Sequence, residues 1–77
     1  MNKARRTSLM NLQDIINKAK EKLEELLEEE EKARDNLPEN LLNSERYERA
    51  EAACYNITDA IDSLEEAMSY IEEAAQQ

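Results

Sequence analysis

Residues 47–75 read YERAEAACYNITDAIDSLEEAMSYIEEAA, and this stretch decides the fold. Its apolar side chains recur at steps that alternate between three and four residues. They are Tyr47, Ala50, Cys54, Ile57, Ile61, Leu64, Met68, Ile71 and Ala75. This heptad spacing keeps one stripe of a helix turned towards a partner helix over several turns. The stretch therefore predicts a long helix, over about residues 44–75, that packs against another helix.

A second stripe of small side chains runs beside the first, with one alanine in every heptad. It consists of Ala53, Ala60, Ala67 and Ala74. Small side chains at a contact let two helix axes approach closely. We therefore expect these alanines to lie against a neighbouring helix.

A matching heptad stripe occupies the first half of the chain. It consists of Leu9, Leu12, Ile16, Ala19, Leu23, Leu26, Glu30, Ala33 and Leu37. The stripe predicts a helix over about residues 7–35, with Thr7 or Ser8 as its N-cap. Asn2 is the alternative cap and would extend this helix backwards. Ile15 and Leu27 flank the stripe and widen its apolar surface.

Residues 36–43 are expected to connect the two helices. Pro38 has no N–H and disfavours α geometry at Leu37, so the first helix should end before Leu37. A short helical turn can begin at Pro38, and Asn43 or Ser44 can cap the second helix. A short connection between helices of similar length favours an antiparallel hairpin.

The two stripes also predict how the helices align. The connection is centred near residue 40, so residues that face each other should have numbers that add up to about 80. With this sum every residue of one stripe meets a residue of the other, as Leu23 meets Ile57. Glu30 then faces Ala50 and lies near Arg46 and Arg49, which offer its carboxylate a partner.

The composition supports a single all-α domain over residues 1–77. The chain has no glycine, which argues against tight turns and compact mixed folds. A two-helix layer buries one side of each helix, and chains this short are marginally stable alone. We expect an antiparallel two-helix coiled-coil hairpin that dimerises into a four-helix bundle. The alternative is a monomeric hairpin whose second face serves another protein.

The charge is strongly acidic, with a formal net charge of −9. From Ala50 to the end there are seven acidic residues and no basic one. Such a surface repels nucleic acid and anionic membranes, so we expect no direct binding to either. It suits a basic protein partner, or simply keeps the protein in solution. No apolar run is long enough to span a bilayer, and the single cysteine fits a reducing compartment, so we expect a cytoplasmic protein.

The sequence lacks the residues that common catalytic and cofactor sites need. There is no histidine, so Cys54 has no base to activate it, and its heptad position indicates core packing. No glycine-rich loop is present to hold phosphate. Glu30 is the one carboxylate on either stripe, too few for a buried metal site. We expect no enzyme, no metal and no cofactor.

The candidate contact residues for a protein partner are the apolar and aromatic side chains that the two stripes leave over. Tyr55 and Tyr70 fall outside the stripes on the second helix, and aromatic side chains are enriched at protein interfaces. The full set is Ile15, Leu27, Ala53, Tyr55, Ala60, Ala67, Tyr70 and Ala74.

The connection is distinctive: residues 35–41 read DNLPENL and residues 44–48 read SERYE. With the helices from about Leu9 to Ile71, it resembles small acidic helical-hairpin proteins encoded by uncharacterised open reading frames of Firmicutes and their prophages. The resemblance implies a bacterial or phage cytoplasmic protein, and it implies no site residues, because that family carries no established function.

Three functional hypotheses follow. The first is a non-enzymatic protein-interaction module, a small accessory or regulatory helical hairpin that forms a homodimer. The second is an acidic inhibitor that mimics nucleic acid and blocks a basic protein, as some phage counter-defence proteins do. The third is a structural coiled-coil spacer without a dedicated partner.

Overall fold

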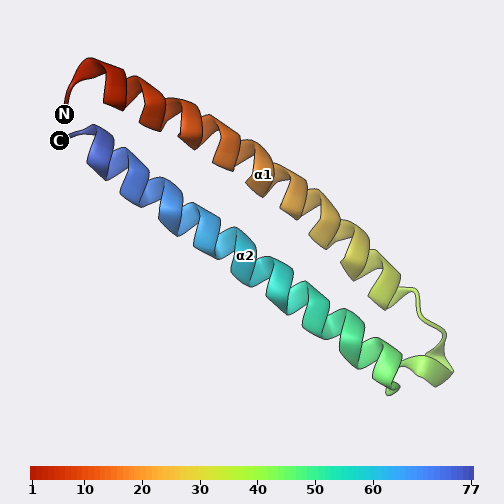
Figure 1. The fold of residues 1–77 in the computed structure, drawn as a ribbon. Coiled ribbons are helices and arrows are strands. Elements are labelled where there is room, and N and C mark those ends of the chain that lie inside the picture. Colours follow the sequence, from red (N-terminus) through yellow and green to blue (C-terminus); the bar gives the residue numbers. More distant parts are fainter.

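The computed structural model describes all 77 residues as an antiparallel helical hairpin. Helix α1 spans Lys3–Asp35, the short 3-10 helix η1 spans Glu39–Leu41, and helix α2 spans Glu45–Ala75. The two long helices lie side by side over their whole length, and both termini lie at the end opposite the connection (Figure 1). The molecule measures 60 × 15 × 11 Å. The predicted all-α hairpin is confirmed.

Helix α1 begins earlier than the cap at Thr7 or Ser8 predicts. Asn2 is its N-cap, and the Asn2 side chain accepts a hydrogen bond from the Arg5 N–H at 2.8 Å. The Arg6 Nε donates to the Ala75 carbonyl oxygen of α2 at 2.6 Å. This bond ties the first turn of α1 to the end of α2, which explains why the helix continues back to Lys3. The start near residue 7 was wrong, and the alternative cap is the one used.

The connection follows the prediction closely. Helix α1 ends at Asp35, before Leu37, and Pro38 directly precedes η1 instead of being its first residue. The Pro38 carbonyl accepts from the Leu41 N–H at 2.8 Å. No residue in the chain has a positive φ angle, so the turn is built without the left-handed conformation that glycine favours.

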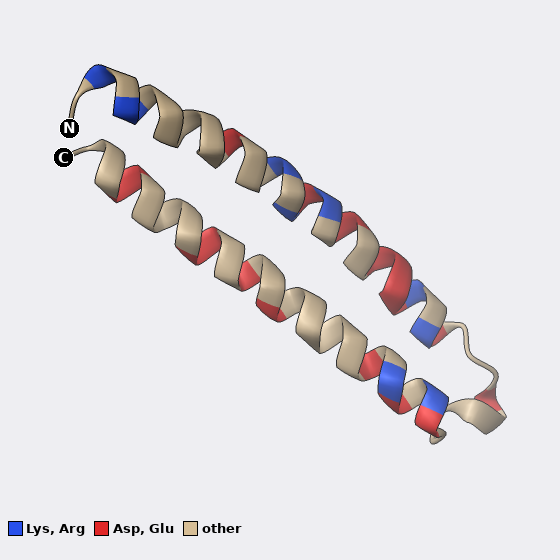
Figure 2. Cartoon of the chain, in the orientation of Figure 1, with Lys and Arg blue, Asp and Glu red and all other residues tan.

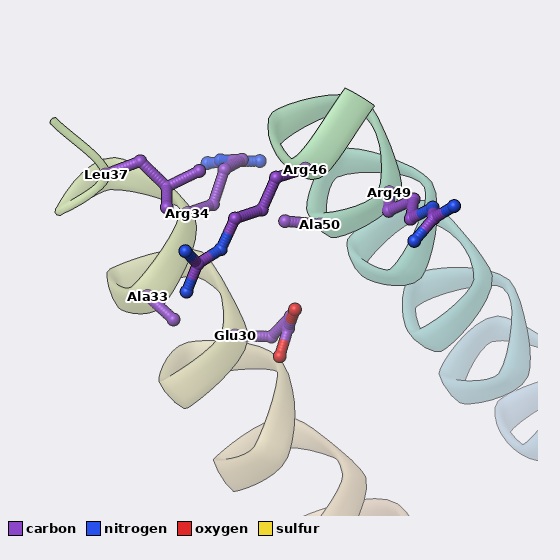
Figure 3. A pocket seen from close by; sticks show the side chains of 7 residues that line it. All are labelled: Glu30, Ala33, Arg34, Leu37, Arg46, Arg49 and Ala50. Carbon is purple, nitrogen blue, oxygen red and sulfur yellow. The ribbon is translucent and has the colours of Figure 1, made fainter. Parts of the chain in front are cut away.

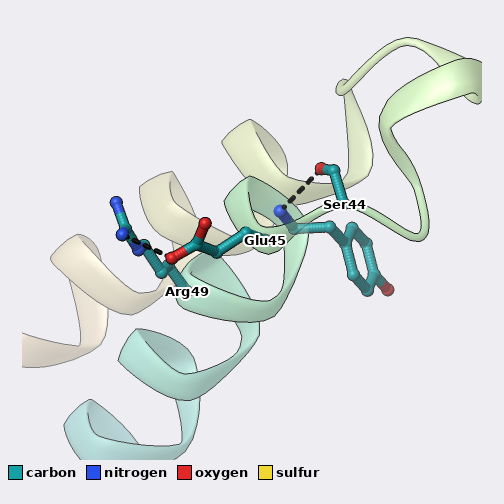
Figure 4. A network of polar contacts seen from close by, with 4 residues as sticks. Ser44, Glu45 and Arg49 are labelled. Carbon is teal, nitrogen blue, oxygen red and sulfur yellow. Dashed lines mark hydrogen bonds and ion pairs between the residues drawn. The ribbon is translucent and has the colours of Figure 1, made fainter.

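Helix α2 begins at a serine cap, one of the two predicted candidates. The Ser44 Oγ accepts from the Tyr47 N–H at 3.3 Å and donates to the Leu41 carbonyl at 2.5 Å. Within the first turns Glu45 pairs with Arg49 at 2.6 Å (Figure 4). Glu45 also carries its negative charge near the helix N-terminus, where the helix dipole favours it.

The helices align as the two heptad stripes predict, to within one residue. Arg6 bonds to the Ala75 carbonyl, and the Gln13 Nε2 donates to the Met68 carbonyl at 3.0 Å; in both pairs the residue numbers add up to 81. Near the connection, Glu30 and Ala50 line the same pocket, which corresponds to a sum of 80.

The face that α1 turns towards α2 differs from the predicted stripe. Leu9, Ile16, Leu23, Glu30 and Leu37 are half-buried as expected. The other predicted members lie outside the contact: Leu12, Ala19, Leu26 and Ala33 are all exposed. The positions that take their place are each one residue further along and half-buried: Gln13, Lys20, Leu27 and Arg34.

Long side chains explain why α1 is turned in this way. Residues 13, 20, 27 and 34 lie opposite Met68, Ile61, Cys54 and Tyr47 at a residue sum of 81. Aliphatic stems can cover apolar neighbours while their polar ends reach hydrogen-bond partners or water. Gln13 bonds to the α2 backbone, and the Lys20 Nζ lies 3.6 Å from the Glu65 carboxylate. The prediction followed apolar residue types and therefore missed these polar members of the contact.

The buried core is very small. Only three of the 77 residues are buried, namely Cys54, Ile61 and Ala75. All three lie on α2 at heptad spacing, facing the long side chains of α1. The helix–helix contact therefore consists mainly of half-buried residues, and only Cys54, Ile61 and Ala75 are buried.

Replacing Ile61 by alanine tests this line of contact. Ile61 is 7% exposed, so Ile61→Ala should lower the free energy of unfolding by about 2–5 kcal/mol, measured by urea denaturation. The control is Tyr55→Ala, because Tyr55 is 66% exposed and should change stability by less than about 0.5 kcal/mol. Equal losses in the two variants would contradict the alignment described here.

Candidate interaction surface

Helix α1 is rotated about its own axis relative to the predicted orientation, so that Leu12 and Leu26 lie outside the helix–helix contact. This rotation leaves a broad apolar surface on one side of the hairpin. The ion pair between Lys20 and Glu65 marks one edge of the helix–helix contact. Helical periodicity places the displaced stripe of α1 and the alanine stripe of α2 together at the opposite edge. We call this surface the apolar face; its members are Leu12, Ile15, Ala19 and Leu26 of α1 and Ala53, Ala60, Ala67 and Ala74 of α2.

The large side chains of the apolar face are well exposed. Leu12 is 49% exposed, Ile15 is 62% exposed and Leu26 is 42% exposed. The four alanines of α2 are half-buried, since α1 covers them in part. The α1 side of the apolar face thus carries three large side chains together with Ala19, and it stands beside a row of alanines on α2.

The structure separates the predicted contact residues into three groups. Ile15 and the four alanines lie together on the apolar face. Leu27 does not belong to a second face, because it is half-buried between the helices opposite Cys54. Tyr55 and Tyr70 are exposed, and the helical repeat turns them away from α1, onto the outer surface of α2. The eight residues therefore do not form one patch.

Three members of the apolar face were not among the predicted contact residues. Leu12, Ala19 and Leu26 had been assigned to the contact inside the hairpin. A second heptad stripe could have shown that these residues lie outside the helix–helix contact. It consists of long side chains that begin at Arg6 and continue through Gln13, Lys20 and Arg34. Because these residues have polar end groups, a search for apolar residue types does not find them, although their aliphatic stems can cover a neighbouring helix.

One pocket, of about 280 Å³, lies between the helices near the connection (Figure 3). Its lining consists of Glu30, Ala33, Arg34, Leu37, Arg46, Arg49 and Ala50. The sequence placed Glu30 near Arg46 and Arg49, and this proximity is confirmed. The ion pair expected there does not form, because no basic nitrogen lies within 4.0 Å of the Glu30 carboxylate.

The arginines of this pocket are largely engaged with their own neighbours. The Arg34 Nε lies 3.0 Å from the Asp35 carboxylate, and this hydrogen bond raises the pKa of Arg34. Arg49 pairs with Glu45, and Arg46 reaches across towards α1 and Glu30 (Figure 3). Two of the three guanidinium groups are thus paired with the carboxylates of Asp35 and Glu45, whereas Arg46 forms no ion pair. The pocket lining carries three arginines and one glutamate, and carboxylates beside the pocket offset the charge of Arg34 and Arg49.

Cys54 has the environment of a core residue. It is 5% exposed, and burial raises the pKa of its thiol, which favours the less nucleophilic protonated form. No group of three metal-ligating side chains comes together in the structure. Neither long helix contains an apolar stretch of the length that crossing a membrane requires.

Charge is distributed unevenly over the hairpin (Figure 2). Basic residues lie at the start of α1, along its middle, and at the connection end of both helices. From Ala50 onwards every charged residue of α2 is acidic, and all of these acidic residues except Glu51 are exposed. The outer surface of α2 is therefore acidic and bears Tyr55 and Tyr70.

In comparisons with protein families, with curated proteins and with solved structures, nothing matches this chain. The resemblance to small acidic hairpin proteins of Firmicutes and their prophages stays a prediction.

Glu30 offers a test of the contact near the connection. It is half-buried without an ion pair, next to three other glutamates, so Glu30→Leu should stabilise the hairpin by about 1 kcal/mol. Urea denaturation measures the change. The control Glu24→Leu removes one exposed negative charge from the same helix without adding buried apolar surface, and should have a smaller effect. A loss of stability in Glu30→Leu would mean that the nearby arginines stabilise the carboxylate.

Proposed function

We propose that this protein is a non-enzymatic protein-interaction module that works as a homodimer. In this proposal two hairpins bury their apolar faces against each other and form a four-helix bundle. The observation that carries the proposal is the exposure of Leu12, Ile15 and Leu26 beside the alanine stripe, in a hairpin with hardly any buried core.

The surface area of the hairpin supports this proposal. Its accessible surface is 5860 Å². A folded monomer of 8.9 kDa is expected to expose about 4,800 Å². The excess of roughly 1,000 Å² is comparable to the roughly 800 Å² that each partner buries in a standard protein interface. A second copy on the apolar face would bring the exposed area close to that of an ordinary globular protein.

The dimer would leave the outer surface of α2 in contact with solvent on both copies. Acidic side chains, with Tyr55 and Tyr70 among them, would then be available to a basic protein partner. Aromatic residues are frequent anchors in protein interfaces, and acidic surroundings speed the approach of a basic partner. A small accessory or regulatory role, in the bacterial or prophage setting that the connection suggests, would suit such a surface.

Lysine substitutions on the apolar face test the homodimer. Light scattering after size exclusion should give the mass of two chains for the natural sequence and of one chain for Leu12→Lys/Leu26→Lys, because charged side chains resist burial in an interface. The control Tyr55→Lys/Tyr70→Lys makes the same charge change on the outer surface and should stay a dimer. A folded single chain for the natural sequence at high micromolar concentration would refute the proposal.

The acidic outer surface favours a second candidate function, an inhibitor that mimics nucleic acid and occupies a basic groove. Its support is the run of exposed carboxylates from Asp59 to Glu73 with no basic residue among them. Binding to a basic nucleic-acid-binding protein should then weaken steeply as salt rises, measured by fluorescence anisotropy at several salt concentrations. The variant Glu65→Gln/Glu66→Gln/Glu72→Gln/Glu73→Gln should show a weaker dependence on salt. Affinity that is indifferent to salt would exclude this candidate.

A further inference from the structure

We propose that the two hairpins of the dimer stack in parallel, with both connections at the same end and with α1 of each copy packed on α2 of the other. The twofold axis would run along the helices, between the two apolar faces. This inference rests on the proposed homodimer and specifies which helix meets which.

The first argument is the match between large and small side chains. On the apolar face the exposed row of α1 contains Leu12 and Leu26, whereas the row of α2 contains only alanines. Helices pack best when large side chains on one enter the space left by small ones on the other. Packing α1 on α2 of the partner satisfies this rule, whereas packing α1 on α1 and α2 on α2 opposes large rows to large and small rows to small.

The second argument is the alignment that the symmetry imposes. A twofold axis along the helices allows no sliding, so residues at the same height within one hairpin also meet across the dimer. Cross-helix contacts inside the hairpin join residues whose numbers add up to 80 or 81. Leu12 then meets the partner's Ala67, Ala19 meets the partner's Ala60, and Leu26 meets the partner's Ala53, all at a sum of 79. The rows thus come level to within one or two residues.

The third argument is electrostatic. Helix α1 carries eight basic and nine acidic side chains, so its net charge is −1. Helix α2 carries two basic and nine acidic side chains, so its net charge is −7. The parallel stack places the two α2 helices on the diagonal of the bundle, each flanked by nearly neutral α1 helices. The alternative stack, with connections at opposite ends, sets one α2 directly on the other and incurs repulsion between like charges.

The ends of the helices agree with the parallel stack. The basic start of α1, with Lys3 and Arg5, would lie beside the acidic end of the partner's α2. At the other end, Glu29 of α1 would lie near the arginines in the first turns of the partner's α2. Opposite charges would therefore meet at both ends of the bundle.

Distances between spin labels on the full chain distinguish the two stacks. A nitroxide at Asn40, an exposed residue of the connection, is introduced by Asn40→Cys in a Cys54→Ala background. In the parallel stack the two labels should be roughly 20–35 Å apart, because neighbouring helix axes lie about 8–10 Å apart and the labels add their own reach. In the alternative stack they lie at opposite ends of a molecule that is 60 Å long.

A second label separates failure of this inference from failure of the homodimer. Glu21 lies near the middle of α1 and is exposed, so a label at Glu21→Cys gives a short distance in either stack. A short distance at Glu21 with one near 60 Å at Asn40 would overturn the parallel stack and leave the homodimer standing. No measurable distance at Glu21, with a single-chain mass, would overturn both. Circular dichroism confirms that each labelled variant remains helical.

Disulfide formation tests which rows meet. When the single-cysteine variants Leu26→Cys and Ala53→Cys are mixed in the Cys54→Ala background and oxidised, the parallel stack predicts a linked pair of unlike chains. A disulfide needs Cα atoms within about 7 Å, which the diagonal pair of α1 helices cannot provide, so Leu26→Cys alone should stay unlinked. Efficient linking of Ala19→Cys to itself would instead indicate adjacent α1 helices and overturn the inference.

Discussion

Two side chains of α1 bond directly to the backbone of α2, and the rest of the arrangement depends on them. The Arg6 Nε reaches the Ala75 carbonyl at 2.6 Å, and the Gln13 Nε2 reaches the Met68 carbonyl at 3.0 Å. Arg6 and Gln13 are seven residues apart, and the same heptad position is occupied further along α1 by Lys20, Leu27 and Arg34. Turning this row inwards turns Leu12 and Leu26 outwards. The same contact that holds the hairpin together thus creates the surface through which we propose that it self-associates.

The heptad spacing, together with Pro38 and Ser44, predicts most of the fold. The two helices, the break before Leu37, the cap at Ser44 and the alignment of the helices to within one residue are visible in the sequence. The rotation of α1 is not visible in the sequence, since it depends on how well the stems of Gln13 and Lys20 cover α2 compared with Leu12 and Ala19. The start of α1 was predicted only by the alternative cap at Asn2, because the bond from Arg6 to the Ala75 carbonyl joins residues far apart in the sequence.

The candidate contact residues were predicted less well than the fold. The alanines and Ile15 do share one face, because their helical spacing decides it. Leu27 was misplaced together with Leu12 and Leu26, since a rotation of α1 exchanges these neighbours. Glu30 was placed near Arg46 and Arg49, yet it pairs with neither, and Arg49 is held by the nearer carboxylate of Glu45. Local pairs along one helix form more readily than pairs between helices because they need no tertiary alignment.

The connection contains no residue with a positive φ angle, and this has a consequence for how the sequence can vary. Any L-amino acid other than proline can adopt the backbone conformations found there, so no position needs glycine or asparagine for steric reasons. The conformational demands of the turn reduce to Pro38 and the Ser44 cap. Substitutions elsewhere in the turn by residues other than proline meet no steric penalty in the backbone, whereas an added or lost residue within either helix would shift every following side chain to a different face. The exposed positions of the tip can therefore take varied residues, whereas the helix lengths are constrained by the contact between the helices.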